Sequence, residues 1–192
     1  ILFGQLRIIN DIDAYRVYGV LLASILVGLT YYWVSILYGG FAGIISSLSL
    51  ALYPLFFSES HFNTEKDIPE TAFWSFFIFS IWKGFTSKNW KWIILSGLFF
   101  GLALGTKLNI VFSAVVLAPW LLIYLRKKIF EKQHLKLIFC GLIAFVIGIV
   151  IFYGTWPYIW QDIVSGTMRF FGFYKLLGSG YNTLDPRFIG PF

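Results

Sequence analysis

Charged residues are scarce in this sequence. Asp, Glu, Lys and Arg make up 12% of its 192 residues, which is about half of the roughly 25% that is usual in a soluble domain. Hydrophobic side chains make up 58%, more than the core of a soluble protein of this size can bury. This imbalance excludes an ordinary soluble enzyme, a disordered region and a free nucleic-acid-binding domain. It predicts a protein that resides in a membrane.

Cysteine and histidine are also rare. A single cysteine, Cys140, excludes a disulfide framework within the chain. The two histidines, His61 and His134, are far apart, and no Cys or His pair has the spacing of metal ligands. The sequence lacks a glycine-rich phosphate loop and a serine nucleophile elbow as well. We therefore expect neither a metal site nor a bound cofactor.

Long apolar runs dominate the sequence instead. Each of six runs is close to the roughly 17–25 residues that cross a hydrocarbon core of about 30 Å. They are Val17–Tyr38, Phe41–Phe57, Pro69–Phe85, Trp90–Thr106, Leu108–Leu125 and Leu137–Thr155. We predict an all-α bundle of about six transmembrane helices that forms one transmembrane domain over residues 1–192. We also expect the sequence to be a fragment of a longer protein that lacks its N- and C-terminal parts.

The basic residues are concentrated in two connectors, Lys83–Lys91 and Arg126–Lys136. Six crossings would put both connectors on one side, with eight Lys or Arg against one acid. The other side would carry seven Lys or Arg against eight acids. Short loops rich in Lys and Arg stay in the cytoplasm. The net charge of +6 is thus explained by topology without a nucleic-acid partner, and the acids mark the extracytoplasmic side.

The polar segment Ser58–Glu70 separates the second apolar run from the third. Pro69 suits the first turn of a helix, where its missing N–H costs nothing. Asp67 then precedes that helix, where a carboxylate can cap free backbone N–H groups. The alternative is that Asp67 is a functional carboxylate beside Lys66 at the membrane surface, and composition alone does not separate the two.

Two cations near the ends of the apolar runs are further candidates. Lys107 is the only residue between the fourth and fifth runs, and an ionisable residue at such a position is a functional candidate whose natural partner is a phosphate. Snorkelling to the interface is the competing explanation. Arg169 lies in an aromatic, amphipathic segment expected to lie along the membrane surface.

Glycine recurs every fourth residue in the fourth run, at Gly97, Gly101 and Gly105. This spacing puts the three glycines near one face of a helix and allows a close backbone approach to a neighbouring helix. We interpret the repeat as a packing feature rather than a catalytic one.

Four segments together resemble a known family. His61–Pro69 is similar to the Asn-x-x-Lys-Asp-x-Pro stretch of the protein mannosyltransferase-like membrane glycosyltransferases (glycosyltransferase family 39, GT-C fold). Asp11–Arg16 resembles the approach to an early transmembrane helix of prokaryotic members. Gly101–Asn109 resembles their glycine-rich helix that ends in Thr-Lys-x-Asn, and Trp156–Asp162 resembles their Trp-Pro-x-x-Trp segment.

The resemblance implies transfer of a hexose, such as mannose, from a polyprenyl- or dolichyl-phosphate carrier to an acceptor on the extracytoplasmic side of the membrane. Asp67 matches a catalytic acidic position of the family. The acid of the family's first outer loop would lie upstream of Ile1, so the fragment alone is expected to be inactive. Cations are expected to stabilise the leaving phosphate, and the expected substrate-binding residues are His61, Asn63, Lys66, Lys107, Asn109 and Arg169.

Two other functions remain open at this level, a secondary transporter and a non-catalytic membrane subunit. Transporters place their binding groups near the bilayer midplane on broken helices, often within inverted repeats. Here the charges lie at the ends of the apolar runs, and no internal repeat is evident.

Overall fold

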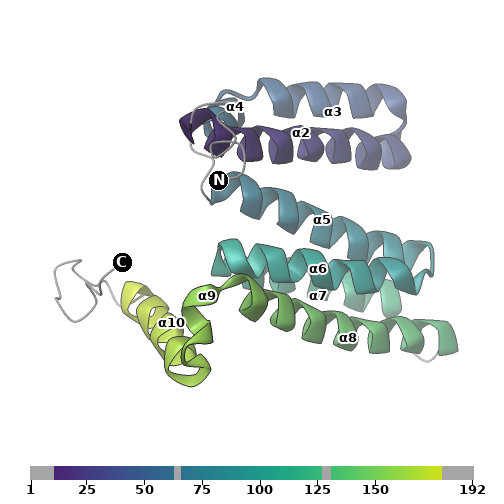
Figure 1. Cartoon of the computed structure of the whole chain (residues 1–192). Helices are drawn as coiled ribbons and strands as arrows, with labels where there is room; N and C mark the ends of the chain where they lie inside the picture. The colour runs from purple at the N-terminus through teal and green to yellow at the C-terminus, as the bar shows by residue number, and fades with distance from the viewer. Residues whose placement is uncertain (1–10, 63–65, 127–130, 179–192) are drawn as a thin grey trace. The chain divides into compact units, whose positions relative to one another are not determined.

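The computed structural model describes residues 11–62, 66–126 and 131–178, and in these ranges the chain is helical without any strand. The elements in chain order are α2 (Asp11–Tyr38), α3 (Gly40–Leu52), α4 (Pro54–Phe62), α5 (Asp67–Thr86), α6 (Trp90–Thr106), the 3-10 helix η1 (Leu108–Phe112), α7 (Ser113–Leu125), α8 (Lys132–Thr155), α9 (Pro157–Trp160) and α10 (Ile163–Gly178) (Figure 1). The predicted all-α class is confirmed. The chain divides into two compact units, Ile1–Phe152 and Tyr153–Phe192.

Three helical stretches of the described chain are long and apolar enough to cross a membrane: Arg16–Tyr38, Leu108–Leu125 and Lys132–Thr155. The pair α3 and α4 is bent by 59° and gives a fourth if it forms one span. Helix α6 is apolar but only 17 residues long. Each predicted run therefore contains a helix, but fewer than six of them meet these criteria for a span.

The second predicted run, Phe41–Phe57, is not one straight helix. Helix α3 ends at Leu52 and α4 begins at Pro54, because proline disfavours helical backbone in the residue before it. Helix α4 then continues to Phe62. The first part of the segment predicted as a polar interruption is therefore helical, and His61 lies on a helix rather than in a loop.

Short turns set the directions of the helices. Gly39, between α2 and α3, has a φ of 93°, a conformation that glycine adopts without steric cost. The side chain of Asn89 accepts a hydrogen bond from the backbone N–H of Lys91 at 3.0 Å and caps the start of α6. Helices α5 and α6 consequently form an antiparallel hairpin and pack extensively on each other (Figure 1).

The core between α2, α5 and α6 is apolar and aromatic. Leu26 and Leu29 of α2 are buried with Phe79 of α5. The ring of Phe79 lies 5.3 Å from that of Trp33 and 5.6 Å from that of Trp92, both in edge-to-face geometry. Such contacts are favourable arrangements of aromatic rings, so this cluster fixes α2 against the α5–α6 hairpin.

The glycine repeat of α6 packs against α8. A Cβ added at Gly97 would collide with the backbone of Ala144, and one added at Gly101 would lie 2.5 Å from the carbonyl oxygen of Gly148. Only glycine permits this separation of the two helices. The interpretation of Gly97 and Gly101 as packing residues is confirmed.

Candidate functional site

The side chain of Lys107 emerges where the chain leaves α6. The backbone N–H of Lys107 donates to the carbonyl of Ala103 at 3.0 Å, and its φ of −159° and ψ of 142° are those of extended backbone. The next residue starts η1, which leads directly into α7. Lys107 is thus the single extended residue between α6 and η1.

Lys107 makes ion pairs with two acids of α5. Its Nζ donates to Oδ1 of Asp67 at 2.9 Å and lies 3.8 Å from Oε2 of Glu70. Asp67 and Glu70 are three residues apart, so they lie on the same side of α5. The α5–α6 hairpin brings the start of α5 next to the end of α6, and this is how residues forty positions apart meet. We refer to these three residues as the acid–lysine cluster.

Of the two interpretations of Asp67, helix capping does not describe its position. Asp67 is itself the first residue of α5, and Lys66 occupies the N-cap position without a side-chain capping hydrogen bond. The carboxylate of Asp67 is directed to Lys107 instead. The side chain of Asp67 is 52% exposed and that of Lys107 is 37% exposed, so a ligand at this end of the unit can reach both.

Glu70 is a site residue that the sequence analysis did not select. Its side chain is only 8% exposed, and its Oε1 is buried without a hydrogen-bond partner among the residues that the structure describes. A buried carboxylate is costly unless a cation lies nearby, and Lys107 provides one. Its position in the sequence, three residues after Asp67, could have indicated that Glu70 lies on the same side of the helix as Asp67.

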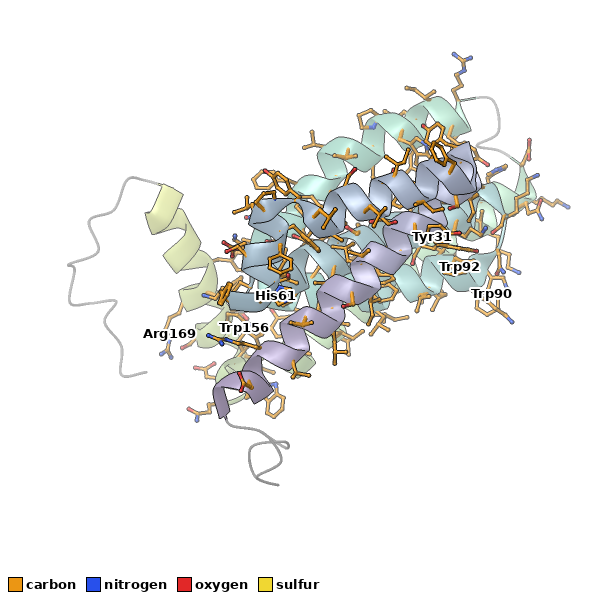
Figure 2. All side chains as sticks on the ribbon, turned by 90° about the horizontal axis from the view of Figure 1, so that it is seen from above. Tyr31, His61, Trp90, Trp92, Trp156 and Arg169 are labelled. Carbon is orange, nitrogen blue, oxygen red and sulfur yellow. The ribbon has the colours of Figure 1, made fainter. Side chains whose placement is uncertain are left out.

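His61 is held by its own helix. Its ring stacks on that of Phe57, with centroids 4.3 Å apart, and its Nδ1 lies 2.8 Å from the carbonyl oxygen of Phe57 and 2.9 Å from Oγ of Ser60. Figure 2 shows His61 at the opposite end of the first unit from Trp90 and Trp92. Its predicted contact with substrate stays a prediction.

The other predicted binding residues are distributed as follows. Lys66 is exposed before α5, and Asn109 is partly buried in η1, two residues after Lys107. Asn63 lies outside the described residues. Among the predicted catalytic and substrate-binding residues that the structure describes, Asp67 and Lys107 are therefore the two that contact each other.

Arg169 belongs to the second unit, in α10. Its guanidinium donates to Oγ of Ser165 at 2.6 Å, and with Gln161, Asp162 and Gly166 it lines a cavity of about 100 Å³. The carboxylate of Asp162 accepts a hydrogen bond from the backbone N–H of Ser165 at 3.1 Å. This bond, with a smaller contribution from the charge of Arg169, holds the pKa of Asp162 below its usual value. Asp162 thus caps α10.

The acid–lysine cluster offers a ligand two kinds of polar group, one ammonium group and two carboxyl groups. An ammonium group binds phosphate as a point charge, and a carboxylate accepts hydrogen bonds from hydroxyl groups. Within the described ranges, no three His, Cys, Asp or Glu side chains are grouped so that they could hold a metal ion.

A comparison with known families identifies the chain. The model of the dolichyl-phosphate-mannose-protein mannosyltransferase family matches residues 2–153, a range that includes Asp67, Glu70 and Lys107 and excludes Arg169. No curated protein and no solved structure matches the chain. The family resemblance found in the sequence is confirmed: this chain belongs to the dolichyl-phosphate-mannose-protein mannosyltransferase family and is a membrane glycosyltransferase of the mannosyltransferase type.

Proposed function

We propose that this protein transfers a hexose, such as mannose, from a polyprenyl- or dolichyl-phosphate carrier to an acceptor on the extracytoplasmic side of the membrane. The observation that carries the proposal is the 2.9 Å ion pair between Asp67 and Lys107, which remains accessible at the end of two apolar helices. A carrier anchored in the bilayer by its isoprenoid chain presents its phosphate at this depth.

The proposed reaction replaces one bond to the anomeric carbon of the sugar. A hydroxyl oxygen of the acceptor attacks this carbon, and the bond from the carbon to the carrier phosphate breaks with its electron pair on the phosphate oxygen. The hydroxyl proton passes to a carboxylate base. Lys107 stabilises the charge that develops on the phosphate, while Asp67 orients Lys107 and accepts a hydrogen bond from a hydroxyl group of the sugar or acceptor.

The charges at the two ends of α6 support the proposed side of the membrane. Lys91 is the second residue of this 17-residue helix, and Lys107 directly follows its last residue, about 25 Å away at 1.5 Å per residue. The basic segments at the Lys91 end favour the cytoplasm. The acid–lysine cluster then faces the opposite side. His61, Asn63, Lys66, Asn109 and Arg169 are proposed as further substrate contacts, and the reaction as written uses no metal or cofactor.

The donor is tested with membranes that contain the full-length protein. We expect radiolabelled mannose to be transferred from mannosyl-phosphoryl-polyprenol, with release of the polyprenyl phosphate, and we expect no transfer directly from a nucleotide-linked mannose. Membranes without the protein give the background. Transfer from the nucleotide sugar in the absence of any polyprenyl phosphate would overturn the proposed donor.

The side of the membrane is tested by cysteine labelling in a Cys140→Ala background. Lys66 and Lys132 are both exposed in the structure and lie near opposite ends of the first unit. Lys66→Cys should react with an impermeant maleimide added outside intact cells, and Lys132→Cys should react only after the cells are opened. The reverse pattern would place the acid–lysine cluster in the cytoplasm and contradict the proposal.

A further inference from the structure

A cavity in the first unit lies apart from the acid–lysine cluster. It is a cavity of about 280 Å³ between α5, α6, α7 and α8, and its walls include Phe85, Ile93, Leu125 and Leu137. Ser96 contributes the only side-chain hydroxyl to the lining, and this hydroxyl donates to the carbonyl of Ile93 at 2.6 Å. An apolar cavity of about 150 Å³ already stays dry and binds small hydrocarbons, so this larger one suits a hydrocarbon chain.

The cavity extends through about one leaflet of a bilayer. Its lining on α8 runs from Leu137 to Phe145, and its lining on α5 runs from Phe77 to Phe85. Each stretch rises about 12 Å along its helix axis, against about 15 Å for half of a hydrocarbon core of about 30 Å. The cavity starts at the end where α5 and α7 terminate and α8 begins, which is the end opposite Lys107.

That end carries positive charge. Lys83, Arg126 and Lys136 are each within two residues of a lining residue, respectively Phe85, Leu125 and Leu137. Arg126 and Lys136 are exposed, and the ammonium group of Lys136 lies 5.9 Å from the ring centre of Trp90. Figure 2 shows Trp90 at this end. Basic and aromatic side chains at a membrane interface are typical contacts of anionic headgroups.

We propose that this cavity binds one acyl chain of an anionic phospholipid, with the phosphate of that lipid among Lys83, Arg126 and Lys136. The depth of the cavity matches a chain from the leaflet at the basic end, and the charge at its mouth matches the headgroup. A carrier whose phosphate lies at Lys107 would approach from the other end of α6. This inference does not rest on the proposed transfer reaction.

Gly141 provides a variant that fills the cavity. It lines the cavity, and a Cβ added there would meet nothing within 4 Å, so Gly141→Leu extends a side chain into the space without a collision at its Cβ. Gly28 on α2 is a matched control, because a Cβ there also meets nothing within 4 Å and Gly28 is not part of the lining.

Binding is measured by native mass spectrometry of the purified protein with dioleoylphosphatidylglycerol or dioleoylphosphatidylcholine. We expect dioleoylphosphatidylglycerol to bind at least fivefold more tightly than dioleoylphosphatidylcholine. Gly141→Leu should weaken its binding at least fivefold, and Gly28→Leu should leave it unchanged. The combined Arg126→Gln and Lys136→Gln exchange, on exposed side chains outside the core, should remove the preference for the anionic lipid.

Three results would overturn the proposal. One is equal binding of the two lipids to the unchanged protein. Another is anionic-lipid binding that survives both Gly141→Leu and the Arg126→Gln, Lys136→Gln exchange. The third is that equimolar polyprenyl phosphate displaces the bound phosphatidylglycerol from the unchanged protein but does not bind to the Gly141→Leu protein. This result would assign the cavity to the carrier. If the Gly141→Leu protein fails to fold, the protein with Arg126→Gln and Lys136→Gln tests the proposal on its own.

Discussion

Replacing Asp67 by Asn in the full-length protein is expected to lower the turnover of sugar transfer at least tenfold while the protein still folds. The side chain of Asp67 is 52% exposed and that of Lys107 is 37% exposed. Exposed ion pairs contribute only about 0–1 kcal/mol to the stability of the folded state. A tenfold loss of rate corresponds to about 1.4 kcal/mol of transition-state stabilisation. The exchange keeps the size of the side chain but removes the charge that orients Lys107. The loss of transition-state stabilisation should therefore exceed the loss of folding stability.

The experiment measures kcat and KM for transfer from mannosyl-phosphoryl-polyprenol. It also measures the thermal stability of each protein. Asp13→Asn is the matched control, because Asp13 is 55% exposed and lies 4.0 Å from Arg16 of its own helix. This control should retain the kcat of the unchanged protein. An Asp67→Asn protein with unaltered turnover would remove Asp67 from the reaction and leave it a surface ion pair.

The helices were predictable because apolar runs of this length have few other stable structures. The break at Pro54 was not predicted, although the proline is visible in the sequence, because the apolar residues continue on both sides of it. The helical start of the polar segment was also missed. Ser58 and Glu59 signal a loop by composition, but they extend α4 without interruption.

The sequence indicated Asp67 and Lys107 separately, since each is a charge at the end of an apolar run. It did not indicate their pairing, because the neighbouring Lys66 was the obvious local partner for Asp67. The pair follows from the antiparallel α5–α6 hairpin, in which only Ser87, Lys88 and Asn89 connect the two helices. The burial of Glu70 depends on how neighbouring elements cover the start of α5, and one-dimensional patterns do not contain that information.

Removing the charge of Lys107 is expected to destabilise the protein through Glu70 rather than through Asp67. The carboxylate of Glu70 is buried, and Lys107 is the cation 3.8 Å from it. Breaking a fully buried pair costs about 3–5 kcal/mol, and the partial exposure of Lys107 reduces this to about 1–3 kcal/mol by screening. Lys107→Ala should therefore lower the melting temperature by several degrees and, if Lys107 contacts the donor phosphate, also raise the KM for the donor.

A double-mutant cycle separates these two effects. Glu70→Gln removes the buried charge, so it should restore most of the stability of Lys107→Ala without restoring donor affinity. Asp67→Asn, which changes an exposed carboxylate, should not rescue stability. A Lys107→Ala protein with unchanged stability would contradict the buried ion pair with Glu70. Unchanged KM and kcat would mean instead that Lys107 only extends toward the membrane interface. The cycle therefore tests the structural and the substrate-binding roles of one lysine independently, because its two acidic partners differ so strongly in burial.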